Sequence, residues 1–175
     1  MGTQFVADRP DAYRCILGID PGLNTTGYAV IIRDSGNLRL VEAGIVRSRA
    51  RDTLPMRLKE LNDGIREVIA SHPIDAMALE QLFSHYERPR TAILMGHARG
   101  VICLAAGEAG LDICHYEPTR VKKVMTGNGR ASKTQMQLAV KLQLGLESVP
   151  EPNDVADAMA IALTGHYLAG NPLAA

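Results

Sequence analysis

The stretch that decides the fold runs from residue 15 to residue 46 and contains three apolar segments in succession. They are CILGID (15–20), GYAVIIR (27–33) and LRLVEAGIV (38–46). Short apolar runs bounded by Pro21-Gly22 and by the turn sequence DSGN (34–37) are typical of β-strands. Three such runs in a row predict an antiparallel meander.

The hydrophobic periodicity changes after this stretch. Pro55 and Pro73 bracket a segment whose apolar residues recur at three- and four-residue steps, which predicts an amphipathic helix. The apolar residues of that helix are Leu54, Leu58, Leu61, Ile65, Val68 and Ile69. Two further strands are predicted at 76–82 and 112–116, and further helices at 91–109, 132–144 and 153–168. This order predicts an α/β domain with one mixed five-stranded sheet, antiparallel on one side, and helices on both faces.

Length and composition favour one soluble globular domain. The chain has 175 residues, of which 46% are hydrophobic and 22% charged. We expect a leader at 1–14, one domain at 15–169 and a short tail at 170–175. No apolar run approaches the roughly eighteen residues of a membrane helix, and the leader lacks the apolar centre of a signal peptide. Three cysteines without CxxC spacing predict free thiols in a reducing cytoplasm and give no zinc site.

The zero net charge conceals an uneven distribution. Residues 84–143 contain nine Lys and Arg against four Asp and Glu, whereas residues 144–175 contain four acids and no Lys or Arg. A nuclease needs a basic surface for phosphates beside an acidic pocket for metal, and this distribution is compatible with both. Ordinary solvated charge is the alternative.

Four carboxylates occupy places where an unpaired charge is costly. Asp20 ends an apolar strand, and Glu80 interrupts another between Leu79 and Leu82. Asp154 and Asp157, three residues apart, share one side of the first turn of a predicted helix. If the strands that carry Asp20 and Glu80 are neighbours and the last helix packs beside them, the four acids converge. Such a cluster suits two-metal hydrolysis of a phosphodiester, with two Mg²⁺ ions per site and Mn²⁺ as a substitute.

Each acid also has an ordinary structural alternative. Asp154 could cap its helix alone or with Asn153, Asp20 could be a turn residue before Pro-Gly, and Glu80 could pair with an arginine.

Five ordered blocks resemble the RuvC family, the bacterial Holliday junction resolvases of the ribonuclease H-like superfamily. The blocks are GIDPGLNTTGYAV (18–30), ALEQLF (78–83), GHARGV (96–101), VKKVMTGNGRASKTQMQ (121–137) and NDVADAMAIA (153–162). The resemblance covers about residues 15–169 and implies a ribonuclease H-like fold. It also implies a Mg²⁺-dependent endodeoxyribonuclease that resolves junctions during recombination and repair. By the same resemblance, the chain would form a homodimer that cuts two opposed strands of a four-way junction symmetrically after loading by a branch-migration motor.

The resemblance also assigns roles to individual residues. Asp20, Glu80, Asp154 and Asp157 match the metal-binding acids, and Lys122 and Lys133 match basic residues beside the scissile strand. Phe83 matches an aromatic residue that wedges into the junction centre. The leader is longer than usual for the family, and the end of the chain lacks the basic tail that some relatives carry.

The remaining basic residues suggest further phosphate contacts. Lys122, Lys123, Arg130 and Lys133 lie in one glycine-containing stretch, and Arg88, Arg90 and Arg99 lie before and along the predicted helix 91–109. In a dimer the three arginines would make a broad basic face. A solvated surface side chain is the alternative for these residues, and it is the favoured one for Lys123. For Phe83 the alternative is a place in the core.

Competing functions remain at this stage. A ribonuclease H-like nuclease acting on another branched or hybrid substrate would have the same four acids. A non-catalytic junction-binding regulator would be expected to lack one or more of them. A sugar kinase or chaperone-like ATPase would need two large domains, which 175 residues cannot supply.

Overall fold

The computed structural model describes residues 13–82 and 89–169. Phe83 and Arg88, for which the sequence predicts DNA contacts, lie outside the described residues, as do the N-terminal residues 1–12 and the C-terminal residues 170–175. The strands are β1 (Cys15–Asp20), β2 (Thr25–Asp34), β3 (Asn37–Arg47), β4 (Ala76–Glu80) and β5 (Asp112–Tyr116). The helices are α1 (Leu54–Ser71), α2 (Pro89–Glu108), α3 (Pro118–Thr126), α4 (Lys133–Leu144) and α5 (Asn153–Leu168).

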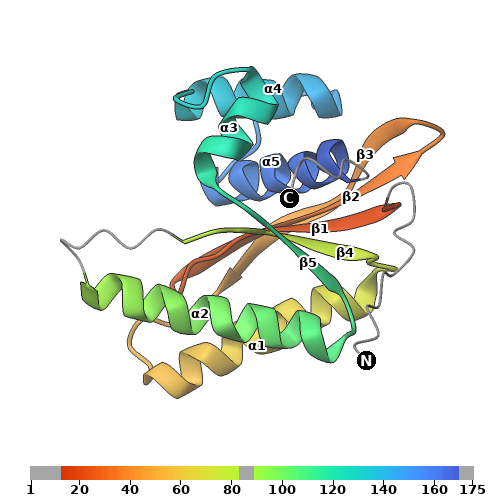
Figure 1. Cartoon of the computed structure of the whole chain (residues 1–175). Coiled ribbons are helices and arrows are strands. Elements are labelled where there is room, and N and C mark those ends of the chain that lie inside the picture. The colour runs from red at the N-terminus through yellow and green to blue at the C-terminus, as the bar shows by residue number, and fades with distance from the viewer. Residues whose placement is uncertain (1–12, 83–88, 170–175) are drawn as a thin grey trace, which may run out of the picture.

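The strands form one mixed sheet in the order β3-β2-β1-β4-β5. The first three strands pair antiparallel, as predicted, and the tight turn between β2 and β3 places Ser35 and Gly36 at positive φ angles of 50° and 88°. Strands β4 and β5 run parallel to β1, with β4 directly beside it. Because β1 and β4 are parallel neighbours, their last residues lie at the same end of the sheet (Figure 1).

Helices cover both faces of this sheet (Figure 1). Alternating residues of β1 and β4 divide between two clusters. Leu17, Ile19 and Leu79 pack with α1 and α2, whereas Ile16 and Ala78 pack with α3, α4 and α5. By the same alternation, Asp20 and Glu80 lie on the α5 face of the sheet. The fold therefore places both carboxylates toward the helix that carries Asp154 and Asp157.

Helix α5 rests directly on the sheet because small residues line the contact. A Cβ atom at Gly18 would lie 2.4 Å from the carbonyl oxygen of Ala158, and one at Gly165 would lie 3.2 Å from the Cβ of Ala78. No larger side chain could replace Gly18 without moving the helix away from the sheet. This close packing fixes the height of α5 above β1 and β4.

Two predictions of secondary structure were wrong in detail. The sequence pattern predicts no helix between β5 and α4, yet α3 forms there, with Pro118 in its first turn and Gly127 in the left-handed conformation at its end. Its apolar pattern is short because it buries only Val121 and Met125. The strand predicted to reach residue 82 ends at Glu80. The neighbouring strand β5 ends at Tyr116, and Pro118 begins a helix two residues later. The last hydrogen bond between the two strands is therefore the one that the Gln81 N–H donates to the Tyr116 carbonyl at 2.8 Å.

The three cysteines are free, as predicted, although Cys15 is buried while Cys103 and Cys114 are only half-buried. Within residues 13–82 and 89–169, no helix is long and apolar enough to cross a membrane.

Candidate active site

Asp20 and Glu80 are the last residues of two neighbouring parallel strands. Ile19 is in register with Leu79, so the residues that follow them, Asp20 and Glu80, emerge side by side. Asp20 also pairs with Gly27 of the antiparallel strand β2. The two acids are therefore held by backbone ladders on both sides of β1, and neither depends on a loop for its position.

The first turn of α5 brings the other two acids to the same place. A Cβ atom at Gly27 would lie 2.0 Å from the carbonyl oxygen of Asp154, so the start of α5 lies against β2 exactly where β2 pairs with Asp20. Asp154 and Asp157 are both half-buried and one helical turn apart. The predicted convergence of the three segments is present in the structure.

The electrostatics of the four acids indicate one shared site. Burial, followed by the charges of Glu80, Asp157 and Asp154, raises the pKa of Asp20 from 3.8 to about 8. Burial and the charge of Asp157 raise the pKa of Glu80 from 4.5 to about 7. Burial likewise raises the pKa of Asp157, and Asp154 adds to the effect. Clustered, partly desolvated carboxylates oppose one another's ionisation, which is typical of functional sites.

Two of the predicted lysines act on this cluster. Lys133, the first residue of α4, lowers the pKa of Asp20 and Asp157, opposing the effect of burial. Lys122 of α3 does the same for Glu80 and Asp157. Lys133 is held at this position because Ser132 caps the helix, accepting a hydrogen bond from the Gln135 N–H at 3.2 Å. Both lysines therefore border the acids.

The side chains do not form a finished metal site by themselves. In the described part of the chain, no three His, Cys, Asp or Glu side chains are arranged so as to hold a metal ion. The donor chemistry nevertheless suits a hard divalent cation, because the cluster offers carboxylate oxygens alone and its members raise one another's pKa. A cation between them would remove that repulsion, so the residues present fit the predicted metal.

The structural alternatives for Asp154 and Glu80 are not supported. Helix α5 has Pro152 at its N-cap and no side-chain cap, so Asp154 is not a capping residue. Glu80 has no ion pair with an arginine among the described residues. Its backbone carbonyl, not its carboxylate, accepts a hydrogen bond from Arg99 Nε at 3.3 Å. The carboxylates of Asp154 and Glu80 therefore stay available to a ligand.

The other described residues for which the sequence predicts DNA contacts differ in how exposed they are. Lys123 and Arg130 are exposed, and Arg130 lies in a turn where its N–H donates to Asn128 Oδ1 at 3.0 Å. Arg90 is exposed in the first turn of α2. Arg99 departs from the expected open basic face, because it is half-buried and its Nη2 contacts His115 Nδ1 at 2.6 Å.

Sequence reasoning missed two residues that position the acids. Gly27 permits the backbone contact with Asp154, and Arg99 holds the backbone of Glu80 from the opposite face of the sheet. A glycine between apolar strand residues is a signal of close backbone approach that would have pointed to Gly27. Nothing in the local sequence distinguishes Arg99 from the other arginines of its segment.

Comparison with known proteins agrees with this architecture. The family model described as crossover junction endodeoxyribonuclease RuvC matches residues 16–166. A RuvC of that description from Rhodopirellula baltica is 72% identical over 173 residues, covering 99% of this chain and 97% of the relative. The RuvC structure of Thermus thermophilus superposes with a TM-score of 0.81 at 32% identity, over 89% of this chain and 95% of that one. A second Thermus thermophilus RuvC structure, in complex with a Holliday junction substrate, gives a TM-score of 0.82 at 32% identity and covers 88% and 94%.

The protein belongs to the ribonuclease H-like class of folds. It has the five-stranded mixed sheet of that class, helices on both faces of the sheet, and carboxylates at the end of the central strands. Within that class, the chain belongs to the RuvC family of crossover junction endodeoxyribonucleases.

Proposed function

We propose that this chain resolves Holliday junctions by metal-dependent hydrolysis of phosphodiesters in two opposed DNA strands. The observation that carries the proposal is the convergence of Asp20, Glu80, Asp154 and Asp157 on one face of the sheet, where burial and mutual repulsion raise the pKa of Asp20 to about 8. Membership of the RuvC family supports the junction as the substrate. An endonuclease of this kind would act during recombination and repair.

The four acids would hold two Mg²⁺ ions, with Mn²⁺ as a substitute. Bound divalent ions would supply an activated water and neutralise the charge that develops on the leaving oxygen. Asp20, at the centre of the cluster, is the residue best placed to be shared between two ions. The raised pKa values of Asp20 and Glu80 mean that both carboxyls must release protons before they can act as ligands.

The lysines would position the scissile strand. Lys133 and Lys122 border the acids and would attract the phosphate that approaches them, with Lys133 also offsetting negative charge in the transition state. Lys123, Arg130, Arg90 and Arg88 would contact phosphates farther out. Phe83 would wedge into the junction centre, and this remains a prediction because Phe83 is outside the described residues.

The second copy of the chain would dock on α2. Ile93 and Leu104 are 61% and 56% exposed on this helix. They line an open groove of about 480 Å³ with Gly96 and Gly100 of α2 and Leu58 of α1. A two-fold contact between apolar surfaces of this kind would bury them and would give each active site one of the two opposed strands.

Three further expectations follow from the family. A branch-migration motor would load the protein on its junction, the enzyme would act in the cytoplasm, and residues 15–169 would be the nuclease domain between a leader at 1–14 and a tail at 170–175.

A cleavage assay tests the proposal. The substrates are a synthetic four-way junction, a linear duplex and an RNA–DNA hybrid of matching sequence, each with Mg²⁺ and with EDTA. Asp20→Asn removes a proposed ligand, and Asp34→Asn makes the same chemical change on the distant β2–β3 hairpin. We expect paired symmetric nicks in the junction alone, lost with EDTA and in Asp20→Asn but kept in Asp34→Asn.

Two results would overturn parts of the proposal. If the protein cuts the hybrid or another branched substrate in place of the junction, the role of the acid cluster is retained but the junction is not the substrate. Binding of junctions without any cutting, over several junction sequences, would make the protein a regulator. Measured in EDTA above about pH 8, where Asp20 is ionised, junction binding by Asp20→Asn should equal or exceed that of the wild type, because the substitution removes a charge that repels phosphate.

A further inference from the structure

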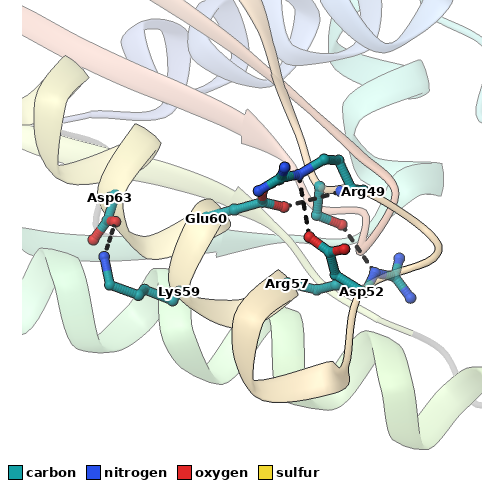
Figure 2. Close-up of polar contacts among 7 residues, drawn as sticks. Arg49, Asp52, Arg57, Lys59, Glu60 and Asp63 are labelled. Carbon is teal, nitrogen blue, oxygen red and sulfur yellow. Dashed lines mark hydrogen bonds and ion pairs between the residues drawn. The ribbon is translucent and has the colours of Figure 1, made fainter.

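A compact charge network lies where β3 passes into α1. Residues 47–63 contain five Lys and Arg residues against three Asp and Glu residues. Figure 2 shows how the acids are used: Arg49 forms ion pairs with Asp52 at 3.1 Å and Glu60 at 2.6 Å, and Lys59 pairs with Asp63. Two of the five cations, Arg49 and Lys59, therefore form ion pairs with all three acids.

The other three cations, Arg47, Arg51 and Arg57, form no ion pair with a described acid. Arg47 and Arg51 are exposed, and neither side chain makes a hydrogen bond or ion pair with any described residue. Arg57 is half-buried and donates to two neutral oxygens, Ser48 Oγ at 3.1 Å and Asn24 Oδ1. We call these three residues the β3–α1 arginine cluster.

The cluster lies at the same end of the sheet as the catalytic acids. Asp20 pairs with Gly27 on β2, and two residues away along β2 Thr25 pairs with Arg47 on β3. Strand spacing and rise place the Cα atoms of Asp20 and Arg47 about 12 Å apart. That separation corresponds to roughly three or four phosphates along one strand of a duplex. Lys122 and Lys133 belong to α3 and α4, whereas Arg47 lies on β3, the strand at the edge of the sheet (Figure 1).

The backbone beside the cluster is firmly held. Thr26 is fully buried, and its Oγ1 donates to the Gly22 carbonyl at 2.6 Å and accepts from the Gly22 N–H at 3.1 Å. The Ser48 N–H donates to the Asn24 carbonyl at 3.1 Å, which ties the β1–β2 turn to the β3–α1 connection. Arg57 spans the same junction. Cations on a rigid support lose less conformational entropy when they bind a ligand.

We propose that the β3–α1 arginine cluster binds the phosphate backbone of a DNA arm where it leaves the active site toward the β3 edge of the sheet. This inference rests on the proposed function, since it extends the DNA path beyond the acids. Arginine suits the role because its planar guanidinium presents several donors to phosphate oxygens. The position favours DNA over an acidic protein surface, because any strand that reaches Asp20 must pass within a few phosphates of Arg47.

The test measures binding of a four-way junction and of a linear duplex by fluorescence anisotropy in EDTA, between about 50 and 200 mM salt. The variant Arg47→Gln/Arg51→Gln removes two cations whose side chains make no hydrogen bond or ion pair with the described residues. Each lost phosphate contact reduces the slope of log K against log salt by about 0.9. The double variant should therefore have a slope shallower by about 1.8, so that wild type loses about twelvefold more affinity over this fourfold salt range.

A matched control lies on the same strand. Arg39 is exposed and its side chain makes no hydrogen bond or ion pair with any described residue, but it lies at the other end of β3, opposite Ile32. Arg39→Gln should leave the slope unchanged, whereas Arg47→Gln should reduce it by about 0.9. Cleavage of the junction should also be unchanged in Arg39→Gln, because Arg39 lies outside the proposed DNA path.

The outcomes separate the two proposals. If the salt dependence of binding by Arg47→Gln/Arg51→Gln has the same slope as that of the wild type, the cluster does not contact DNA, whatever the cleavage assay gives. An acidic protein surface would then be the partner that fits the cluster. Salt-dependent binding that weakens as expected, with no junction cutting by the wild type, would retain the contact and overturn the resolvase function.

Discussion

Gly27 and Asp154 are in backbone contact, so that a Cβ atom on Gly27 would come within 2.0 Å of the Asp154 carbonyl oxygen. Gly27 is also the cross-strand partner of Asp20. One glycine therefore sets the separation between the strand that carries the first acid and the helix that carries the last two. The geometry of the acid cluster depends on the absence of a side chain at position 27.

We expect Gly27→Ala to damage both stability and cleavage. The added methyl group cannot be accommodated without moving the first turn of α5, because the atom it meets belongs to the backbone. Forced overpacking of this kind costs about 1–3 kcal/mol. Thermal unfolding should show a lowered Tm, and cleavage of a four-way junction should fall even at temperatures where the variant remains folded.

Gly107→Ala provides the control. Gly107 is in α2, and a Cβ atom there would meet nothing within 4 Å. Alanine favours helix over glycine by about 1 kcal/mol, so this variant should be as stable as wild type or more so. A Gly27→Ala protein with wild-type Tm and full activity would show that the contact does not position the acids.

The parts of the fold that sequence could predict are those with strong periodicity. Three apolar runs separated by turn residues gave the meander, and acids inside apolar strands marked Asp20 and Glu80. Their convergence followed from strand order, since parallel neighbours end at one edge. The pattern of α3 was too weak because only Val121 and Met125 are buried, and its stability comes from packing on α4 and α5.

Contacts between distant segments could not be predicted in the same way. The contact of Gly27 with Asp154 joins residues far apart in sequence, and so does the hydrogen bond of Arg99 to Glu80. The free charge of Arg47 and Arg51 becomes apparent only once Arg49 is seen to occupy Asp52 and Glu60. Local sequence gives the residues but not their partners.

Metal-free protein should lose stability as the pH rises from about 4 to about 8. The pKa of Asp20 is raised from 3.8 to about 8 in the folded chain, so across this range the folded state retains a proton that the unfolded state has released. The folded state binds more protons, and rising pH therefore favours unfolding. Tm values measured in EDTA should fall over this range for wild type.

Asp20→Asn should flatten that dependence and raise the Tm near pH 8, because it removes the buried charge. Asp34→Asn on the exposed hairpin should behave as wild type does. An Asp20→Asn protein that loses stability with rising pH as steeply as wild type would mean that Asp20 ionises as freely as it does in the unfolded chain.

Mg²⁺ should stabilise the protein more at about pH 8.5 than at about pH 5.5. The carboxyls of Asp20 and Glu80 have pKa values raised to about 8 and about 7, so at the lower pH the cation competes with protons for both. The rise in Tm on adding Mg²⁺ should be measured at both pH values. Glu80→Gln should reduce it and Asp34→Asn should not, whereas equal stabilisation at both pH values would contradict the assignment of these ligands.

Leu104→Asp should convert the proposed dimer into monomers and uncouple its two proposed cuts. Leu104 is 56% exposed on the apolar groove of α2, and an aspartate there would lose its water when a second copy covered the groove. Sedimentation should show a concentration-dependent shift to monomer, and junction cleavage should yield single nicks in place of paired ones. Leu142→Asp, which alters a 70% exposed leucine on α4, is the matched control and should remain dimeric. If Leu142→Asp dissociates the protein while Leu104→Asp does not, the second copy docks on α4, and the active sites face the junction from a different direction.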